Sequence, residues 1–352
     1  MIDQARLDRF GQQMVGDLAA AYAGAMTSIG HKLGLWRALA GAGPITPAAL
    51  AERTGCAERY VREWLSCQAA GGYVDYDAAK GTFTLPDEHA AFLADPDSPA
   101  FVAPAYDVVS AVWHGEEKVT EAFRTGRGIG WHEHHHSLFH GTEAFFRTGY
   151  RAFLTSEWIP ALTGIAERFA ERGGRIADVG CGHGASSILM AQAWPQVRVD
   201  GFDYHGGSID TARQRAADAA VADRVAFARA TAKDYPGTGY DLICFMDCLH
   251  DMGDPLGAAR HARQALAEDG SVLLVEPWAG DRLEDNLNPV GRLYYAASTA
   301  LCTPNSLSQE VGTALGAQAG EARLTAILSE AGFGTIRRAA QTPFNLILEA
   351  RA

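Results

Sequence analysis

Between Arg175 and Glu276 the chain alternates short apolar runs with longer amphipathic stretches. The apolar runs predict buried strands, and the amphipathic stretches between them predict helices. The five predicted strands are Ile176–Val179, Val197–Phe202, Val225–Arg229, Leu242–Met246 and Ser271–Glu276. Such alternation favours a parallel sheet with helices on both faces, to which Gly334–Ile336 and Phe344–Glu349 are expected to add an edge hairpin.

The beginning of the chain has the periodicity of helices. Apolar residues from Arg6 to Leu39 recur mostly at three- and four-residue steps, as they do on amphipathic helices. Gly30 and Gly34 fall within this stretch, and we expect them to interrupt the helices because glycine is a weak helix former.

A helix, a turn, a second helix and a hairpin follow. Thr46 can cap the first of these helices, and Pro47 suits its first position. The remaining predicted elements are a helix over Ala57–Ala70 and short strands within Gly71–Asp77 and Gly81–Leu85. This order of elements is that of a winged helix.

A winged helix can bind DNA or serve as a packing and dimerisation module, and the charge of the domain distinguishes the two. A DNA reader needs positive charge on its second helix and the flanks of that helix. Residues 1–100 contain eight Lys or Arg and twelve Asp or Glu, and on the second helix Arg59 and Arg62 are balanced by Glu58 and Glu63. We therefore expect a packing and dimerisation module, with DNA binding as the alternative.

Length and composition limit the remaining possibilities. A chain of 352 residues is too long for one ordinary core, and we expect units at 1–95 (winged helix), 96–165 (helical connector and substrate cap) and 166–352 (sheet). The net charge of −12 disfavours polyanions as partners. The six cysteines have no metal-like spacing, and neither a signal peptide nor a membrane span is predicted, which indicates a cytoplasmic protein with reduced thiols.

A glycine-rich turn joins the first predicted strand of the sheet to a helix. The strand ends in Asp178-Val-Gly-Cys-Gly-His-Gly184, and Ala185–Ala193 continues as a helix whose free N–H groups can bind a carboxylate. Gly180-x-Gly182-x-x-Ala185 also fits a dinucleotide site, but an acid before the first glycine suits an amine better than a pyrophosphate. Asp203, at the end of the next strand, can accept hydrogen bonds from ribose hydroxyls.

These motifs resemble those of class I S-adenosylmethionine-dependent methyltransferases, which implies an α/β, Rossmann-like, mostly parallel sheet behind the mainly helical winged-helix domain. In that family the acid and glycines bind the methionine part, the second-strand acid binds the ribose, and residues after the third strand flank the adenine. Carried over to this chain, the resemblance implies a cofactor site made of Asp178, Gly180, Cys181, Gly182, Gly184, Asp203, Tyr204, Thr231, Ala232, Lys233 and Asp247. Thr231 stands where the family often has an aspartate.

The candidate chemistry follows the fourth predicted strand, where His250 and Asp251 lie just beyond its carboxyl end. The segment resembles the Leu-His-Asp-Trp-x-Asp of winged-helix O-methyltransferases, whose histidine is the general base, although Met252 replaces the tryptophan. Histidine can take a proton from an attacking hydroxyl, and Asp251 or Glu276 could orient it. The alternative is a positioning histidine, since many methyl transfers need little beyond alignment of the reactants.

Aromatic and histidine-rich segments are candidates for the acceptor pocket. The cluster Trp131-His-Glu-His-His-His-Ser137 suggests a metal site or a loop over the substrate, and we favour the loop because adjacent side chains seldom converge on one ion. Phe146 and Tyr150 are spaced as on a helix, which fits a core or a pocket wall equally well. The predicted substrate residues are Trp131, His134, His135, Phe146, Tyr150, Tyr294 and Tyr295.

Taken together, the sequence predicts methyl transfer from S-adenosylmethionine, with S-adenosylhomocysteine as product, to a small-molecule acceptor. A hydroxyl oxygen is the expected target, ahead of nitrogen or carbon. We expect a homodimer without a metal. The competing hypothesis is a regulator that senses S-adenosylmethionine and binds DNA, and nearly the whole chain also resembles actinobacterial two-domain methyltransferases, some of which are labelled regulators.

Overall fold

The computed structural model describes all 352 residues, and the chain divides into two compact units. The first unit comprises residues 1–111 and 136–148, and the second comprises residues 112–135 and 149–352. No helix combines the length and the apolar composition needed to cross a membrane.

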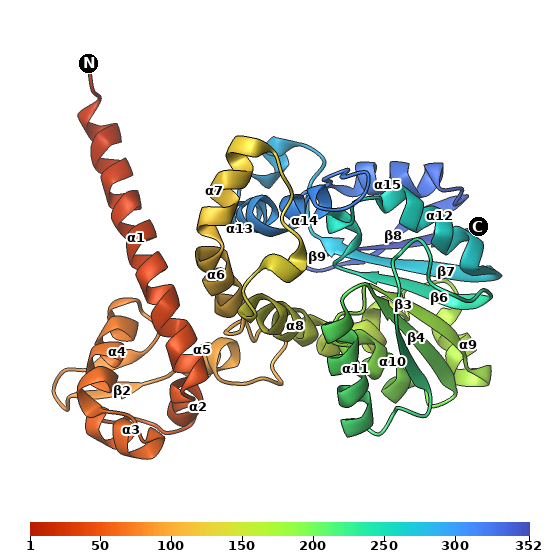
Figure 1. Cartoon of the computed structure of the whole chain (residues 1–352). Coiled ribbons are helices and arrows are strands. Elements are labelled where there is room, and N and C mark those ends of the chain that lie inside the picture. The colour runs from red at the N-terminus through yellow and green to blue at the C-terminus, as the bar shows by residue number, and fades with distance from the viewer. The chain divides into compact units, whose positions relative to one another are not determined.

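The first unit contains the predicted winged helix. Thr46 caps α3 by accepting a hydrogen bond from the Ala49 backbone N–H, as expected. The elements of this part are α1 (Gln4–Lys32), α2 (Leu35–Leu39), α3 (Pro47–Thr54), α4 (Glu58–Ala70), β1 (Asp75–Asp77), β2 (Thr82–Thr84) and α5 (Asp87–Leu93). Strands β1 and β2 pair antiparallel to form the wing (Figure 1).

The expectation that Gly30 interrupts the first helix is wrong, because α1 continues through it to Lys32. A Cβ atom at Gly30 would lie 2.5 Å from Cζ2 of Trp64 and 2.7 Å from Nε1 of Trp36. The glycine therefore lets two tryptophan rings of the winged-helix core approach the helix backbone. Gly34 does end the helical run, with the left-handed φ of 70° that glycine tolerates.

The predicted α/β architecture is confirmed in the second unit. Seven strands form one sheet in the order β5-β4-β3-β6-β7-β9-β8, in which the first five are parallel and β9 is antiparallel to both of its neighbours. The strands are β3 (Gly174–Val179), β4 (Val197–Asp203), β5 (Val225–Arg229), β6 (Tyr240–Met246), β7 (Leu266–Pro277), β8 (Thr335–Gln341) and β9 (Asn345–Arg351). The five parallel strands contain their predicted apolar runs, whereas β8 and β9 each begin one residue later than predicted and extend further, to Gln341 and Arg351.

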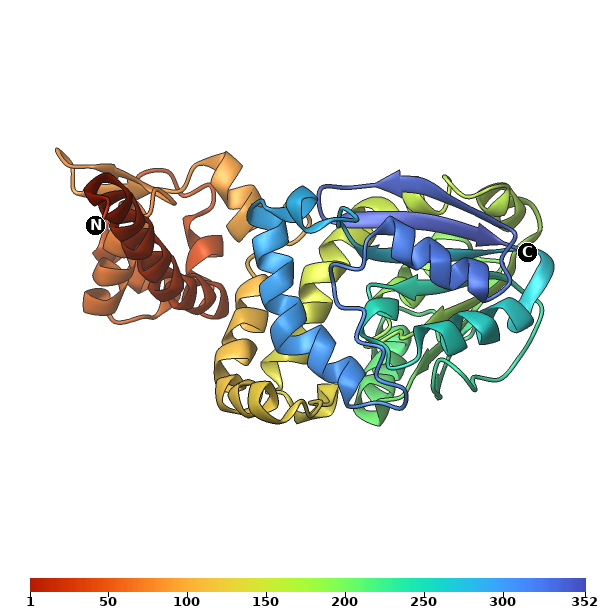
Figure 2. The ribbon, with the colours of Figure 1, turned by 90° about the horizontal axis from the view of Figure 1, so that it is seen from above.

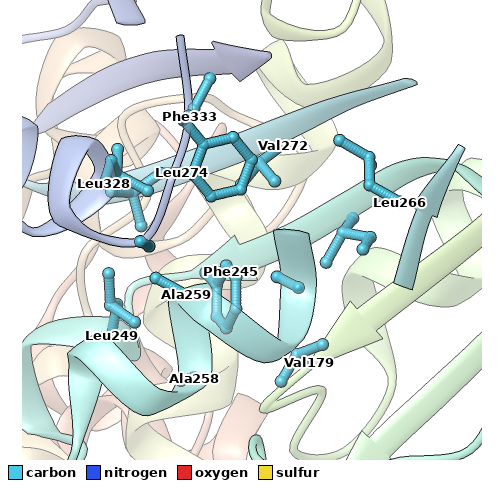
Figure 3. Packing of buried hydrophobic residues seen from close by; sticks show 14 of the residues in the cluster. Val179, Phe245, Leu249, Ala258, Ala259, Leu266, Val272, Leu274, Leu328 and Phe333 are labelled. Carbon is cyan, nitrogen blue, oxygen red and sulfur yellow. The ribbon is translucent and has the colours of Figure 1, made fainter. Parts of the chain in front are cut away.

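Helices α10 and α11 cover one face of this sheet, and α12 and α15 cover the other (Figures 1 and 2). The sheet-flanking helices are α9 (Ile165–Arg172), α10 (Ala185–Ala193), α11 (Gly206–Asp218), α12 (Pro255–Ala265) and α15 (Glu321–Glu330). On the α12 side, small alanines such as Ala258 and Ala259 let the helix pack closely on Phe245 and Leu274 (Figure 3). This core holds the carboxyl ends of the strands in place.

Helical segments lie within the stretch predicted as a helical connector, and others follow β7. They are α6 (Ala105–His114), α7 (Glu116–Thr125), α8 (Ser137–Gly149), the π-helical turn Tyr150–Trp158, α13 (Pro289–Ala297), the π-helical turn Ser298–Cys302 and α14 (Thr303–Leu307). Shorter 3₁₀ turns lie at Trp131–Glu133, Leu249–Asp251 and Leu283–Asn286. π-Helical turns often mark functional sites, and each of these two carries a residue of the candidate site described next.

Candidate active site

Asp178, near the end of β3, is completely buried. Its Oδ2 atom accepts hydrogen bonds of 2.6 Å from the hydroxyls of Ser186 and Ser187, at the start of α10. Its Oδ1 atom has no hydrogen-bond partner in the chain, although a buried carboxylate oxygen normally has one. Burial raises the pKa of Asp178. The free oxygen therefore fits a ligand that brings its own donor, such as an ammonium group.

The turn after Asp178 needs glycine for two reasons. Gly184 has a φ of 79°, and a Cβ atom there would lie 2.6 Å from the Phe227 ring, so this position can hold nothing larger. Gly182 also has a positive φ, but a Cβ atom there would point into open space. The Gly182 side of the turn is thus where a ligand can approach the backbone. This cradle and the unpaired oxygen of Asp178 fit the amino-acid end of S-adenosylmethionine.

Asp203 closes the next strand and contacts the glycine turn. Its Oδ2 accepts the Gly182 backbone N–H at 3.0 Å, and its Oδ1 accepts that of His205 at 2.8 Å. The side chain remains partly accessible although desolvation raises its pKa, as expected for a carboxyl group that lines a recess. The neighbouring Tyr204 hydroxyl hydrogen-bonds to the backbone of Trp131, which brings the Trp131 segment to the ribose end of the predicted cofactor site.

The predicted adenine-flanking residues lie in a turn after β5. Asp234 accepts hydrogen bonds of 2.7 Å from both the backbone N–H and the hydroxyl of Thr231. Lys233 forms ion pairs with Asp254 at 3.2 Å and Glu310 at 3.0 Å, so its ammonium group ties this turn to other surface segments. Contact of this turn with the cofactor, including contact through Ala232, stays a prediction.

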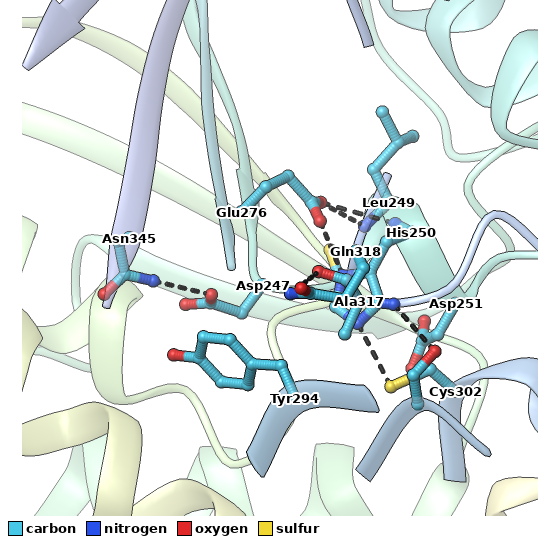
Figure 4. A network of polar contacts seen from close by, with 12 residues as sticks. Asp247, Leu249, His250, Asp251, Glu276, Tyr294, Cys302, Ala317, Gln318 and Asn345 are labelled. Carbon is cyan, nitrogen blue, oxygen red and sulfur yellow. Dashed lines mark hydrogen bonds and ion pairs between the residues drawn. The ribbon is translucent and has the colours of Figure 1, made fainter. Parts of the chain in front are cut away.

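His250 and Glu276 form a buried pair at the ends of β6 and β7 (Figure 4). His250 Nδ1 lies 2.5 Å from Glu276 Oε2, while Glu276 Oε1 accepts the backbone N–H groups of Leu249 and His250. Of the two orienting residues considered, Glu276 contacts the imidazole. The Asp251 backbone carbonyl accepts hydrogen bonds from Asn305 and Gln309 instead.

The other imidazole nitrogen faces a thiol. Cys302, on the second π-helical turn, places its Sγ 3.3 Å from His250 Nε2 (Figure 4). Burial on its own lowers the pKa of an imidazole, but the charge of Glu276 and the contact with Cys302 outweigh it and raise the pKa of His250 well above its usual value. No sequence signal identified Cys302, because it lies 52 residues from His250 in the chain.

Asp247 forms a second polar cluster at the same sheet edge. Its carboxyl group accepts hydrogen bonds from the Tyr150 hydroxyl at 3.0 Å and from the Asn345 amide at 2.8 Å. Desolvation, followed by the nearby charge of Glu276, raises the pKa of Asp247 to about 8. The structure thus brings together predicted residues from the cofactor and substrate groups. Asn345, at the start of β9, was missed, and its only signal is a polar residue that opens an apolar strand.

The other predicted substrate residues are dispersed. Tyr294 lies beside Asp247 in Figure 4 and donates its hydroxyl proton to the Phe344 carbonyl, whereas Tyr295 is half-buried. Phe146, on α8, belongs to the first compact unit. The substrate roles of all three stay predictions.

The histidine-rich segment does not form a metal cluster. His135 stacks on His114 with ring centroids 4.1 Å apart, while His134 is buried and makes no hydrogen bond through either ring nitrogen. No three His, Cys, Asp or Glu side chains anywhere in the chain are arranged to hold a metal ion. The Asn305 side chain accepts the Trp131 backbone N–H at 3.0 Å, which fastens the segment to α14.

Comparison with known families agrees with this geometry. Residues 150–310 match a methyltransferase domain family, and residues 21–95 match the Rv2258c-like winged helix-turn-helix domain. The chain therefore carries a methyltransferase domain behind an N-terminal winged helix-turn-helix domain. The family match of the methyltransferase domain takes in Asp178, Asp203, His250 and Glu276.

A curated relative of the chain is a methyltransferase by name. The 27-O-demethylrifamycin SV methyltransferase of Amycolatopsis mediterranei is 34% identical over 121 residues, which is 32% of this chain and 44% of that protein. The chain therefore spans less than half the length of this curated relative.

Two solved structures share the fold over almost their whole length. Mitomycin 7-O-methyltransferase MmcR has a TM-score of 0.68 and 23% identity, with 99% of this chain and 100% of the other covered. Human N-acetylserotonin methyltransferase, solved with S-adenosylmethionine, has a TM-score of 0.70 and 17% identity, with 99% and 98% covered.

Proposed function

We propose that this methyltransferase moves a methyl group from S-adenosylmethionine to a hydroxyl oxygen of a small molecule. The observation that carries the proposal is that the Asp178–Gly184 cradle and the His250–Glu276 pair lie at the carboxyl ends of neighbouring strands. Ligands of parallel α/β sheets bind at that edge. Mitomycin 7-O-methyltransferase by its name, and the rifamycin methyltransferase by its 27-O-demethyl substrate, support oxygen as the target.

In this mechanism each residue has a limited task. S-adenosylmethionine supplies an electrophilic methyl group when bound. Asp178 would hold its amine through the unpaired Oδ1 atom, and Asp203 would accept its ribose hydroxyls. Glu276 holds the proton of His250 on Nδ1, so that Nε2 carries the lone pair that accepts the acceptor's proton. The Cys302 thiol has to move aside for an acceptor hydroxyl to reach that nitrogen.

Cofactor binding can be tested by calorimetric titration of the purified protein with S-adenosylhomocysteine. We expect Asp203→Ala to abolish micromolar binding, while Asp210→Ala, an exposed control on α11, keeps it. A folded wild-type protein free of co-purified ligand that binds neither S-adenosylhomocysteine nor S-adenosylmethionine would refute the proposal.

The role of His250 can be tested once an acceptor has been found by screening. We expect His250→Ala to lower kcat by roughly 10²- to 10⁴-fold and to leave cofactor affinity within about twofold, because general-base catalysis contributes about that much. Since the pKa of His250 is raised, the form with a free lone pair accumulates as pH rises, and the wild-type rate should rise with it. A variant with unchanged kcat would assign His250 to positioning or structure.

We further propose that the protein is a cytoplasmic homodimer assembled through α1. Leu7, Phe10, Met14 and Leu18 recur at three- and four-residue steps on this helix, and each is between 42% and 57% exposed. An apolar stripe of this kind on a 29-residue helix is suited to a second copy of the same helix. All six cysteines are free, which suits the reducing cytoplasm.

Light scattering coupled to gel filtration tests this assembly. We expect a dimer for the wild type and a monomer for the double variant Phe10→Glu, Leu18→Glu, with Gln12→Glu as a control on the same helix. A wild-type protein that is monomeric at micromolar concentration would refute the proposed dimer.

The regulator hypothesis has less support from the structure. Arg59 and Arg62 on α4, the second helix of the winged helix, are engaged by Glu63 and Glu58 in ion pairs of 2.5 and 2.7 Å. These pairs neutralise the charge with which such a helix would approach phosphates. A gel shift at low salt should therefore show no salt-sensitive DNA binding.

A further inference from the structure

Asp247 has an unusual position for an acidic residue. It follows β6 directly and adopts a positive φ of 51°, a conformation that costs free energy outside glycine. The residue is only partly buried, at the carboxyl edge of the sheet. Two neutral donors, Tyr150 and Asn345, fix its carboxyl group from the first π-helical turn and from β9.

No lysine or arginine of the chain pairs with this carboxyl group, and the nearest cationic side chain, His250, is paired with Glu276. The charged groups that face it are Glu276 on β7 and His250 beyond β6, which already pair with each other, and Tyr294 of α13 contributes a neutral phenol. No lysine or arginine of the chain is buried. A desolvated carboxyl group without a cationic partner prefers the protonated state, and the pKa of about 8 agrees with this. A cation arriving with a ligand would ionise it.

The cluster lies next to the cofactor cradle. Strand β6 pairs with β3, and a Cβ atom at Gly180 would lie 2.8 Å from the sulfur of Cys248, the residue after Asp247. The buried Tyr150 hydroxyl is close enough to Asp178 and Asp247 to be affected electrostatically by both. Tyr150 therefore contacts Asp247 directly through its hydroxyl, on the side of the sheet edge where Asp178 lies.

We propose that Asp247, with the Tyr150 ring beside it, recognises the positive charge of the sulfonium group and so distinguishes S-adenosylmethionine from its uncharged product. Sulfonium and quaternary ammonium cations are attracted by the charge of a carboxylate and by the face of an aromatic ring. The proposal rests on the cofactor assignment above. It gives the protein a means to bind the donor tightly and to release S-adenosylhomocysteine, which lacks that charge.

Calorimetric titration at pH 7.5 tests the proposal without an acceptor. The ligands are S-adenosylmethionine, S-adenosylhomocysteine and sinefungin, in which a carbon bearing an amino group replaces the sulfonium. The proteins are the wild type, Asp247→Asn, and Asp251→Asn as a control that removes a neighbouring acid with a raised pKa, about 7. Comparing ratios of affinities between proteins at one pH cancels the titration of the ligands themselves.

We expect Asp247→Asn to weaken S-adenosylmethionine and sinefungin by roughly tenfold and S-adenosylhomocysteine by less than about twofold, since an opposite charge nearby shifts a pKa by about 1 to 3 units. Asp251→Asn should change all three affinities by a similar factor. Equal weakening of the three ligands by Asp247→Asn, or an unchanged ratio, would overturn the proposal. Failure of every ligand to bind the wild type would instead refute the cofactor assignment itself. Equal melting temperatures of the proteins would establish that the variants are folded.

Discussion

Replacing Glu276 with glutamine tests the buried pair that positions His250. The substitution keeps an oxygen that can accept the Leu249 N–H but removes the charge 2.5 Å from His250 Nδ1. Breaking one partner of a buried ion pair costs about 3 to 5 kcal/mol. At pH 6, where His250 is protonated, we expect the free energy of unfolding to fall by about 3 kcal/mol, measured by urea denaturation of wild type and variant.

The destabilisation caused by Glu276→Gln should depend on pH. Because the folded-state pKa of His250 is raised, the pair contributes fully below the unfolded pKa of about 6.5. Above it, the wild type loses about 1.4 kcal/mol for each pH unit until the folded-state pKa is reached. The difference between wild type and Glu276→Gln should therefore shrink between pH 6 and pH 9. A difference that stays constant or grows over this range would refute the reasoning.

Glu349→Gln is a matched control for the pH series. Glu349 is buried on β9 and contacts Arg337, Ser271 and Thr163. Burial acts to raise its pKa, but these hydrogen bonds and the arginine outweigh burial and lower it, so the group is ionised in both folded and unfolded states from pH 6 to pH 9. Its contribution is lost only as pH falls through the folded-state pKa. The cost of this substitution should thus stay constant where that of Glu276→Gln shrinks.

Glycine substitutions give further predictions. Gly184→Ala should destabilise the fold by about 1 to 3 kcal/mol, because of its positive φ and the contact with Phe227, and should abolish S-adenosylhomocysteine binding in a thermal-shift assay. Gly182→Ala has room for its methyl group, so it should lower the melting temperature less while still blocking the ligand. Gly30→Ala should destabilise the protein by about 1 to 3 kcal/mol despite the better helix propensity of alanine, since two tryptophan rings lie within 2.7 Å of the new atom. Gly16→Ala, in an open part of the same helix, should stabilise it by about 0.5 to 1 kcal/mol in thermal unfolding, and the opposite order of these two variants would contradict the packing argument.

Local patterns predicted the sheet well because each strand is encoded by its own run of apolar residues. The same holds for Asp178 and Asp203, which adjoin strand ends and glycines that can be recognised within a few residues. The wrong expectation of a helix break at Gly30 arose because the reason for this glycine lies far away in the sequence. The sequence shows a weak helix former there, but its reason for being glycine lies in Trp64, 34 positions further along the chain.

The side-chain clusters could not be predicted for a related reason. Cys302 approaches His250 across 52 residues, and Asn345 approaches Asp247 across 98. Neither cysteine nor asparagine stands in a recognisable motif, so only the folded sheet and the insertion after β7 reveal the contact. Resemblance to a family identified the histidine and the acids but not the groups that modify them.

The reversal of strand direction at β9 affects how this protein can change. Because β9 runs antiparallel, Asn345 reaches the ligand edge from the start of the strand, while Glu349 lies further along it, bonded to Thr163 and Ser271. The short turn between β8 and β9 therefore opens onto the reaction edge, far in sequence from the glycine cradle. We therefore expect substitutions in that turn to change acceptor preference without disturbing the Asp178–Gly184 turn, which makes it a suitable starting point for directed evolution.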